Sequence, residues 1–282
     1  MMRRKLAALG AGSRPGFRLR GLEVSRVEGF SDAVFGFALT LLVVSLEVPR
    51  TFDELLAAMR GLPAFAVSFA LLMVVWYGHY LFFRRYGLED TLTITLNAFL
   101  LFVVLFYVYP LKFLFTVFFA QFTAAGAVAT LPGGAVVEMI RQRDVPHLFE
   151  VYGAGYAAVS LIFALLHRHA YRRRADLALT PLEIADTRAE IVRYLLLAGV
   201  GLLSMLCAVF VPVRGAGLAG FVYFLVGFIE AFHGAAVGRR RKGLAHSSPE
   251  SPGSPGSPAG TSNTNVPPSA LPASPQPEDR PS

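Results

Sequence analysis

Residues 26–42 read RVEGFSDAVFGFALTLL, a mostly apolar segment with the acidic residues Glu28 and Asp32 near its start. A helix needs about 20 mostly apolar residues to cross a hydrocarbon core of about 30 Å. We predict the first membrane span over Val27 to Val48. A charge at the centre of a span costs about 2.5–3.5 kcal/mol on insertion scales, so Glu28 and Asp32 are candidate functional residues.

The first predicted span has two chemically different faces. Glu28 and Asp32 are four residues apart, which puts both on one face of a helix. At 100° per residue, Phe37 lies about 140° around the helix from Asp32. We therefore expect Asp32 to face the rest of the helix bundle. The other face carries an uncharged stripe, which consists of Phe30, Ala33, Phe37, Thr40/Leu41, Val44 and Val48.

The composition of the whole chain indicates an integral membrane protein. Of the 282 residues, 54% are apolar and only 16% are charged, whereas soluble domains carry about 25% charged residues. Five further runs are long enough to span a membrane: Leu62 to Phe83, Leu92 to Tyr109, Leu148 to Leu166, Ile191 to Val213 and Ala216 to Val237. We predict an all-α integral membrane protein with six transmembrane helices, in which Pro110 to Phe122 forms a bent exit from the third span.

The basic residues lie on alternate connections between the predicted spans. They are Arg3, Arg4, Lys5, Arg14, Arg18, Arg20 and Arg26 at the N-terminus, Arg84 and Arg85 in the second connection, Arg168, Arg172, Arg173, Arg174, Arg188 and Arg193 in the fourth, and Arg239, Arg240, Arg241 and Lys242 after the last span. Cytoplasmic connections of membrane proteins are enriched in Lys and Arg, so we expect both termini in the cytoplasm. We expect the protein in the plasma membrane. The net charge of +7 then reflects topology and attraction to anionic lipid rather than nucleic-acid binding.

Three regions follow from these patterns. Residues 1–25 form a basic cytoplasmic segment, and residues 26–238 form the six-helix transmembrane domain. Residues 239–282 begin with basic residues and continue as a Ser, Pro and Gly-rich tail, whose composition is typical of disorder.

A motif at the start of the first span resembles the signature of a known family. Arg26, Phe30, Ser31 and Asp32 fit the pattern R-x-x-x-F-S-D. The second span has Trp76 and His79 in a W-x-x-H spacing, and the third has Asn97 and Pro110. Together these residues resemble the transmembrane protein 175 family of potassium channels, over residues 26 to about 112.

The resemblance implies a homotetramer of six-span subunits in which the first span of each subunit lines a central pore. It implies further that apolar rings close this pore. The matching positions for the pore lining and gate are Phe37, Thr40, Leu41 and Val44, with Phe37 at the main constriction. The residues that would anchor the lining helix to its neighbours are Arg26, Phe30, Ser31, Asp32, Trp76, His79 and Asn97.

Several of these residues have a second interpretation. Asp32 is interpreted either as an ion or proton site in the conduction path or as part of an interhelical network, and the network is favoured because buried membrane charges need partners. His79 is a structural histidine or a pH sensor. Glu230 and His233, three residues apart, form either a proton relay or a snorkelling pair near the end of the last span.

The sequence favours a potassium-permeable leak channel that conducts passively. Motifs of hydrolases, zinc proteases and nucleotide-binding enzymes are absent from the sequence, so we expect neither an enzyme nor a cofactor or metal site. The filter sequence T-V-G-Y-G is also absent, so selectivity is assigned to Thr40 hydroxyls or to partial dehydration at the apolar rings. The expected partners are copies of the same chain and membrane lipids, with no nucleic acid. A cation- or proton-coupled secondary transporter is the alternative, and a non-conducting membrane protein is a third.

Overall fold

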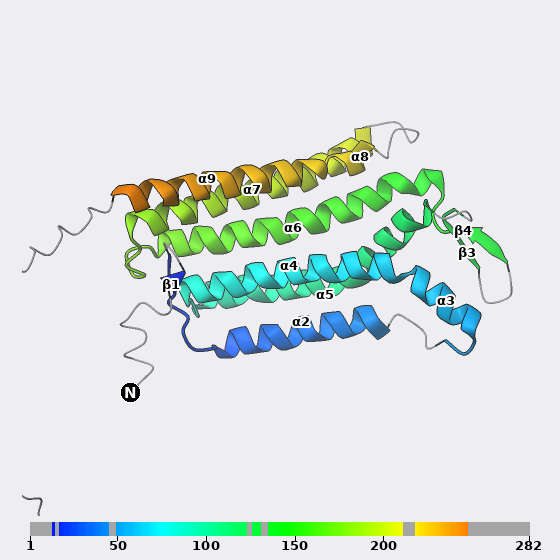
Figure 1. The fold of residues 1–282 in the computed structure, drawn as a ribbon, viewed down its shortest axis with the longest axis horizontal. Helices are drawn as coiled ribbons and strands as arrows, with labels where there is room; N and C mark the ends of the chain where they lie inside the picture. The colour runs from blue at the N-terminus through cyan, green and yellow to red at the C-terminus, as the bar shows by residue number, and fades with distance from the viewer. Residues whose placement is uncertain are drawn as a thin grey trace, which may run out of the picture.

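A computed structural model describes residues 13–14, 17–44, 49–122, 126–130, 135–210 and 218–247. Long helices lie side by side in one bundle, with the short hairpins at its two ends (Figure 1). The helices are α2 (Arg26–Val44), α3 (Phe52–Arg60), α4 (Leu62–Tyr86), α5 (Thr91–Ala120), α6 (Val145–Arg172), α7 (Pro181–Phe210), α8 (Leu218–Phe221) and α9 (Phe224–Ser247), with a 3-10 turn η1 (Gln142–Asp144) before α6. The antiparallel hairpins pair β1 (Ser13–Arg14) with β2 (Phe17–Arg18) and β3 (Val128–Thr130) with β4 (Val136–Glu138).

The structure confirms an all-α membrane protein. Five segments are long and apolar enough to cross a membrane: Leu62–Tyr86, Thr91–Ala120, Gln142–Arg172, Pro181–Phe210 and Ala219–Ala236. The first predicted span corresponds to the shorter helix α2, which has 19 residues. The end of that prediction, residues 45–48, lies outside the described residues, as does the predicted disorder of residues 248–282.

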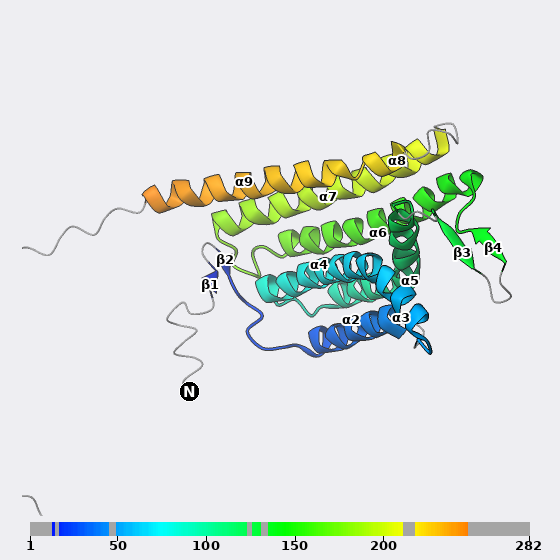
Figure 2. The same cartoon turned by 45° about the vertical axis from the view of Figure 1, so that its right-hand side comes forward.

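Helix α5 passes through the proline at which we predicted the span to end. Pro110 lies inside α5, and the part of the helix beyond it turns away from the bundle axis in Figure 2. One turn later, the Leu114 N–H donates to the Tyr152 hydroxyl of α6 at 3.2 Å. This bond ties the part of α5 beyond the proline to α6. The exit that we predicted over Pro110 to Phe122 is helical as far as Ala120.

The last two spans also differ in extent from the predictions. Helix α7 begins at Pro181, ten residues before the predicted Ile191, because its first turns are held by ion pairs rather than by apolar burial. The last predicted span is divided between α8 and α9 by a turn at residues 222–223. Helix α9 then continues past residue 238, the predicted end of the membrane domain, to Ser247.

Helix α2 lies at one edge of the bundle and α9 at the opposite edge (Figure 1). Helix α2 packs against α4 and α5, while α6 packs along α7, which in turn supports α9. Helix α2 contributes three buried side chains to the hydrophobic core: Phe35, Ala38 and Leu42. The arrangement leaves the opposite side of α2 without a packed helix among the described residues.

Candidate functional site

The exposed face of α2 carries no charge beyond its first two turns. The exposed residues from residue 33 onward are Ala33, Gly36, Phe37, Thr40 and Val43. Phe37 is 68% exposed and Val43 is 49% exposed. A large apolar surface on one side of a helix requires lipid or another protein chain to cover it.

Two of the four predicted pore residues lie on this face. Phe37 and Thr40 are exposed, whereas Leu41 is half-buried and packs against the core. Leu41 follows Thr40 by about 100° around the helix, which turns it toward the bundle. The side chain of Val44 lies outside the described residues.

Thr40 presents its oxygen rather than its proton to the exposed face. Its hydroxyl donates to the Phe37 carbonyl of the same helix at 2.7 Å. A hydroxyl whose proton is used in this way keeps lone pairs that can accept a hydrogen bond or contact a cation.

Buried polar residues join the other face of α2 to α4 and α5. Asn97 Nδ2 donates to Ser31 Oγ at 2.8 Å, and His79 Nε2 lies 2.9 Å from Asn97 Oδ1. All three residues are at most 3% exposed. Beside them, Trp76 Nε1 donates to Asp32 Oδ1 at 2.8 Å. The structure therefore brings together five of the seven predicted anchoring residues. Asp32, which we expected to face the bundle, bonds Trp76 but is itself exposed. Arg26 and Phe30 are also exposed and lie outside this network.

The direction of these hydrogen bonds indicates which ring nitrogen of His79 carries the proton. Ser31 Oγ already donates to the Val27 carbonyl at 2.7 Å, so it must accept from Asn97. Asn97 Oδ1 then accepts from His79, which places the proton on Nε2. The other nitrogen, Nδ1, is buried without a hydrogen-bond partner among the described residues. The centroid of the His79 ring lies 5.6 Å from that of Phe35 and 4.7 Å from that of Phe83. A second proton would be buried against apolar rings, so the site favours a neutral structural histidine.

The segment that leads into α2 is fixed to the helix ends beneath it. Arg20 Nη2 and Glu183 Oε2 form an ion pair of 2.8 Å, and the backbone N–H groups of Arg20 and Gly21 donate to the Arg84 carbonyl at 3.1 and 3.2 Å. Gly87 adopts a left-handed conformation, with φ of 58°, and an added Cβ there would lie 3.2 Å from the Gly21 nitrogen. The start of α2 is thus tied to both α4 and α7.

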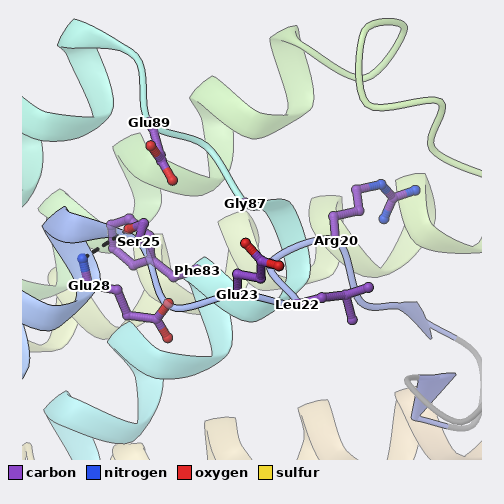
Figure 3. Close-up of a pocket in the computed structure, with 9 residues that line it drawn as sticks. Arg20, Leu22, Glu23, Ser25, Glu28, Phe83, Gly87 and Glu89 are labelled. Carbon is purple, nitrogen blue, oxygen red and sulfur yellow. Dashed lines mark hydrogen bonds between the residues drawn. The ribbon is translucent and has the colours of Figure 1, made fainter. Parts of the chain in front are cut away.

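A cavity of about 360 Å³ lies beside the start of α2. Figure 3 shows the carboxylates of Glu23, Glu28 and Glu89 around it. The Glu28 side chain is only 4% exposed, and its carboxylate lies 3.6 Å from Arg84 Nε. Arg20 also lines the cavity, so charges of both signs surround the first turn of α2. The sequence indicated Glu28 alone, because nothing in its local pattern links residue 28 to residue 89.

Glu230 and His233 each face α7 instead of forming a relay with each other. Arg193 Nη1 pairs with Glu230 at 2.8 Å, and His233 Nε2 lies 3.8 Å from Glu190. Glu190 also pairs with Arg85 of α4 at 3.0 Å. This network joins α4, α7 and α9. Sequence reasoning missed Glu190, since its partner Arg85 is 105 residues away along the chain.

Fold and site together define an all-α membrane protein whose N-terminal helix combines an anchored polar face with an exposed face that is uncharged beyond its first two turns. Residues 26–107 match the family described as endosomal/lysosomal potassium channel TMEM175. A potassium channel from Marivirga tractuosa is 42% identical over 230 residues, which cover 79% of this chain and 91% of that protein. A potassium channel from Streptomyces collinus is 33% identical over 157 residues, which cover 53% of this chain and 66% of the relative.

A solved structure shares the fold. The crystal structure of the potassium channel MtTMEM175, a T38A variant in complex with a nanobody-MBP fusion protein, superposes with a TM-score of 0.69 at 39% identity. The match covers 81% of this chain and 99% of that one. The chain belongs to the TMEM175 family of potassium channels. The resemblance seen in the sequence is thereby confirmed, and the matching family is one of channels rather than enzymes.

Proposed function

We propose that four copies of this chain form a potassium channel of the plasma membrane, which conducts passively through a central pore lined by the exposed face of α2. The observation that carries the proposal is that this face is uncharged at Phe37 and Thr40 while the opposite face is hydrogen-bonded into the subunit. Membership in the TMEM175 family supports potassium as the permeant ion.

The chemistry of the two positions suits a narrow hydrated pore. Four copies of Phe37 around one axis form an apolar ring, where an ion must shed part of its water and where the pore can close by dewetting. Four Thr40 oxygens one turn further along replace part of the lost hydration, since their protons are already used within the helix. Val44 is assigned to the next ring, and Leu41 supports the ring from the core side.

The remaining features describe how the pore helix is held and oriented. The bonds from Trp76 to Asp32 and from Asn97 to Ser31 prevent α2 from rotating its charged face into the pore. Six spans place residues 1–25 and 239–282 in the cytoplasm, on the basic side of the membrane. This topology is supported by the distribution of Arg and Lys between alternate connections.

A flux assay tests the proposal. Purified tetramers in liposomes should pass potassium down its gradient without a coupling ion. The change Phe37→Asn should raise the flux about tenfold, which corresponds to a barrier lowered by about 1.4 kcal/mol, and should reduce the preference for potassium over sodium. The matched control is Phe102→Asn, because Phe102 of α5 is exposed to the same extent, 68%.

Three outcomes would contradict the proposal. Intact tetramers in tight vesicles that pass no potassium would exclude a leak channel. Saturable uptake that requires a proton or sodium gradient would indicate a coupled transporter. An equal increase with Phe37→Asn and Phe102→Asn would remove Phe37 from the constriction.

A further inference from the structure

Arg174 and Arg188, at the junction of α6 and α7, lack the carboxylate partners that Arg20, Arg85 and Arg173 have nearby. Arg20 pairs with Glu183 at 2.8 Å, Arg85 with Glu190 at 3.0 Å and Arg173 with Asp176 at 2.8 Å. Within the described part of the chain, Arg174 and Arg188 form no ion pair with a carboxylate. Both are exposed. Their positive charges are therefore open to an external anion.

Tyr171 holds both guanidinium groups in place. The Cζ atoms of Arg174 and Arg188 lie 4.9 and 5.0 Å from the centroid of its ring. Arg188 also donates to the Tyr171 hydroxyl through Nε at 3.0 Å and through Nη2. Arg174 Nη1 donates to the Tyr171 carbonyl at 3.3 Å. Stacking on an aromatic ring orients a guanidinium before any ligand binds, so less side-chain entropy is lost when an anion binds.

The geometry concentrates two like charges and leaves most of their donors unused. The two Cζ atoms are separated by no more than the sum of their distances to the shared centroid, which is within about one Debye length at 0.1 M salt. A guanidinium has five N–H donors, and the bonds above use only part of each set. A phosphate group accepts from such forks in bidentate fashion and removes the repulsion between the two cations.

The surrounding surface indicates that the phosphate belongs to a lipid. On α6, Leu161 and Leu165 are exposed at 47% and 38%, and the same helix face continues at Arg168 and Arg172. On α7, exposed residues Val192 and Leu195 follow Arg188 at helical spacing. Each helix thus has an exposed stripe that is apolar along its length and basic at the end near the α6–α7 junction.

The acyl chains of a phospholipid can pack against the apolar part of each stripe, which places its head group beside the basic residues. We infer that Tyr171, Arg174 and Arg188 form a binding site for the phosphate of an anionic phospholipid. Basic pockets between membrane helices are known to select anionic head groups in this way. The site lies outside the residues assigned to the pore, so the inference does not depend on how ions pass.

Native mass spectrometry of the full chain in detergent tests the site with phosphatidylglycerol and phosphatidylcholine as probes. The unaltered protein should retain phosphatidylglycerol in preference to phosphatidylcholine. The double change Arg174→Gln and Arg188→Gln should weaken phosphatidylglycerol binding about tenfold, as expected from the loss of charge-assisted hydrogen bonds. The matched control is Arg18→Gln with Arg239→Gln, which removes the same charge from two exposed arginines that contact no aromatic ring among the described residues.

A second variant, with lysine at both positions, tests the site even if the glutamine variant fails to fold. Arg174→Lys with Arg188→Lys keeps the charge but removes the planar fork, and it should lower the affinity for phosphatidylglycerol by several-fold while the assembly mass stays unchanged. Equal retention of both lipids, or equal losses in the glutamine and control pairs, would overturn the inference. Binding of inorganic phosphate as tight as that of phosphatidylglycerol would overturn it as well, because the acyl chains would then contribute nothing to the affinity.

Discussion

Asn97 connects three helices through one side chain, because its amide bonds Ser31 of α2 and His79 of α4 from a position on α5. The change Asn97→Leu keeps the approximate volume but removes both bonds. Interhelical hydrogen bonds in membranes contribute about 0.6 kcal/mol on average and up to about 1.7 kcal/mol. We therefore expect a loss of about 1–3 kcal/mol, seen as a lower thermal unfolding midpoint in detergent.

Thr95→Val is the control on the same helix. The Thr95 hydroxyl is exposed and donates only to the Thr91 carbonyl, one turn earlier. Its replacement should leave the midpoint nearly unchanged. An equal decrease for both variants would mean that Asn97 does not join the helices.

Asp90 gives the protein a testable acid sensitivity outside the membrane spans. Burial raises the pKa of this carboxyl, but hydrogen bonds from Thr93 and His169 outweigh burial and hold the pKa below its ordinary value of 3.8. His169 Nε2 lies 2.5 Å from the Asp90 carboxylate. A carboxyl with a lowered folded-state pKa stabilises the protein above the unfolded-state pKa and loses that contribution as the pH falls through the folded-state value.

The unfolding midpoint should therefore decrease as the pH falls below about 4. Asp90→Asn should have a lower midpoint than the unaltered protein at neutral pH and a smaller decrease on acidification. Asp53→Asn, at an exposed position in the first turn of α3, should follow the unaltered curve. A parallel acid response of Asp90→Asn and the unaltered protein would exclude Asp90 as the titrating group.

The residues that could be predicted from sequence are those that a short motif brings together. The spacing of Ser31, Asp32, Trp76 and His79 indicated which side chains meet, although it did not give the direction of the hydrogen bonds. Glu183 could not be identified, since its partner Arg20 is 163 residues away along the chain. Helical periodicity reports neighbours within a few turns, whereas such ion pairs depend on how the helices are packed.

At the scale of elements, the contact between α6 and α7 depends on backbones that approach closely. A Cβ added at Gly201 would lie 2.7 Å from the Gly153 carbonyl oxygen and 2.9 Å from the Ala157 nitrogen. Backbone atoms cannot move aside as a flexible side chain does, so Gly201→Ala must separate the two helices. We expect a destabilisation of about 1–3 kcal/mol, measured as the unfolding midpoint in detergent.

Gly199 is a matched control two residues earlier on the same helix. Nothing lies within 4 Å of a Cβ added there. Gly199→Ala should be neutral or should stabilise the helix by up to about 1 kcal/mol, because alanine favours the helix more than glycine does. Similar effects at both positions would show that the close contact at Gly201 is not required.

The elements themselves could be predicted better than their ends. Runs of apolar residues identified the helices that correspond to α4, α5, α6 and α7, because crossing the bilayer requires about 20 mostly apolar residues and such a run is visible in the sequence. The start of α7 was missed because its first turns contain Glu183 and Asp186, which are charged yet buried. The short helix α3 and the hairpin of β3 and β4 lie in connections, where hydropathy carries no such constraint.

At the scale of the whole molecule, the position of α2 at the edge of the subunit could not be derived from its two-faced pattern. The pattern predicts a buried face and an exposed face, but lipid and a second copy of the chain cover an apolar face equally well. A pore shared by four subunits requires the lining helix at an edge. In the structure α2 and α9 lie at opposite edges (Figure 1), and both expose large phenylalanines: Phe37 at 68% and Phe228 at 74%.

Cysteine cross-linking distinguishes the pore edge from the lipid edge, because the chain has a single cysteine, Cys207, which Cys207→Ser removes. In that background, Phe37→Cys should form disulfide-linked dimers in oxidised membranes, since a constriction brings the Cβ atoms of neighbouring subunits toward the separation of about 4 Å that a disulfide needs. Phe228→Cys should stay monomeric, because the proposed tetramer would leave α9 facing acyl chains rather than another subunit. Reduction should return the Phe37→Cys dimers to monomers on a denaturing gel. Dimers formed by Phe228→Cys and not by Phe37→Cys would instead place α9 at the subunit interface, and the pore would then require a different lining helix.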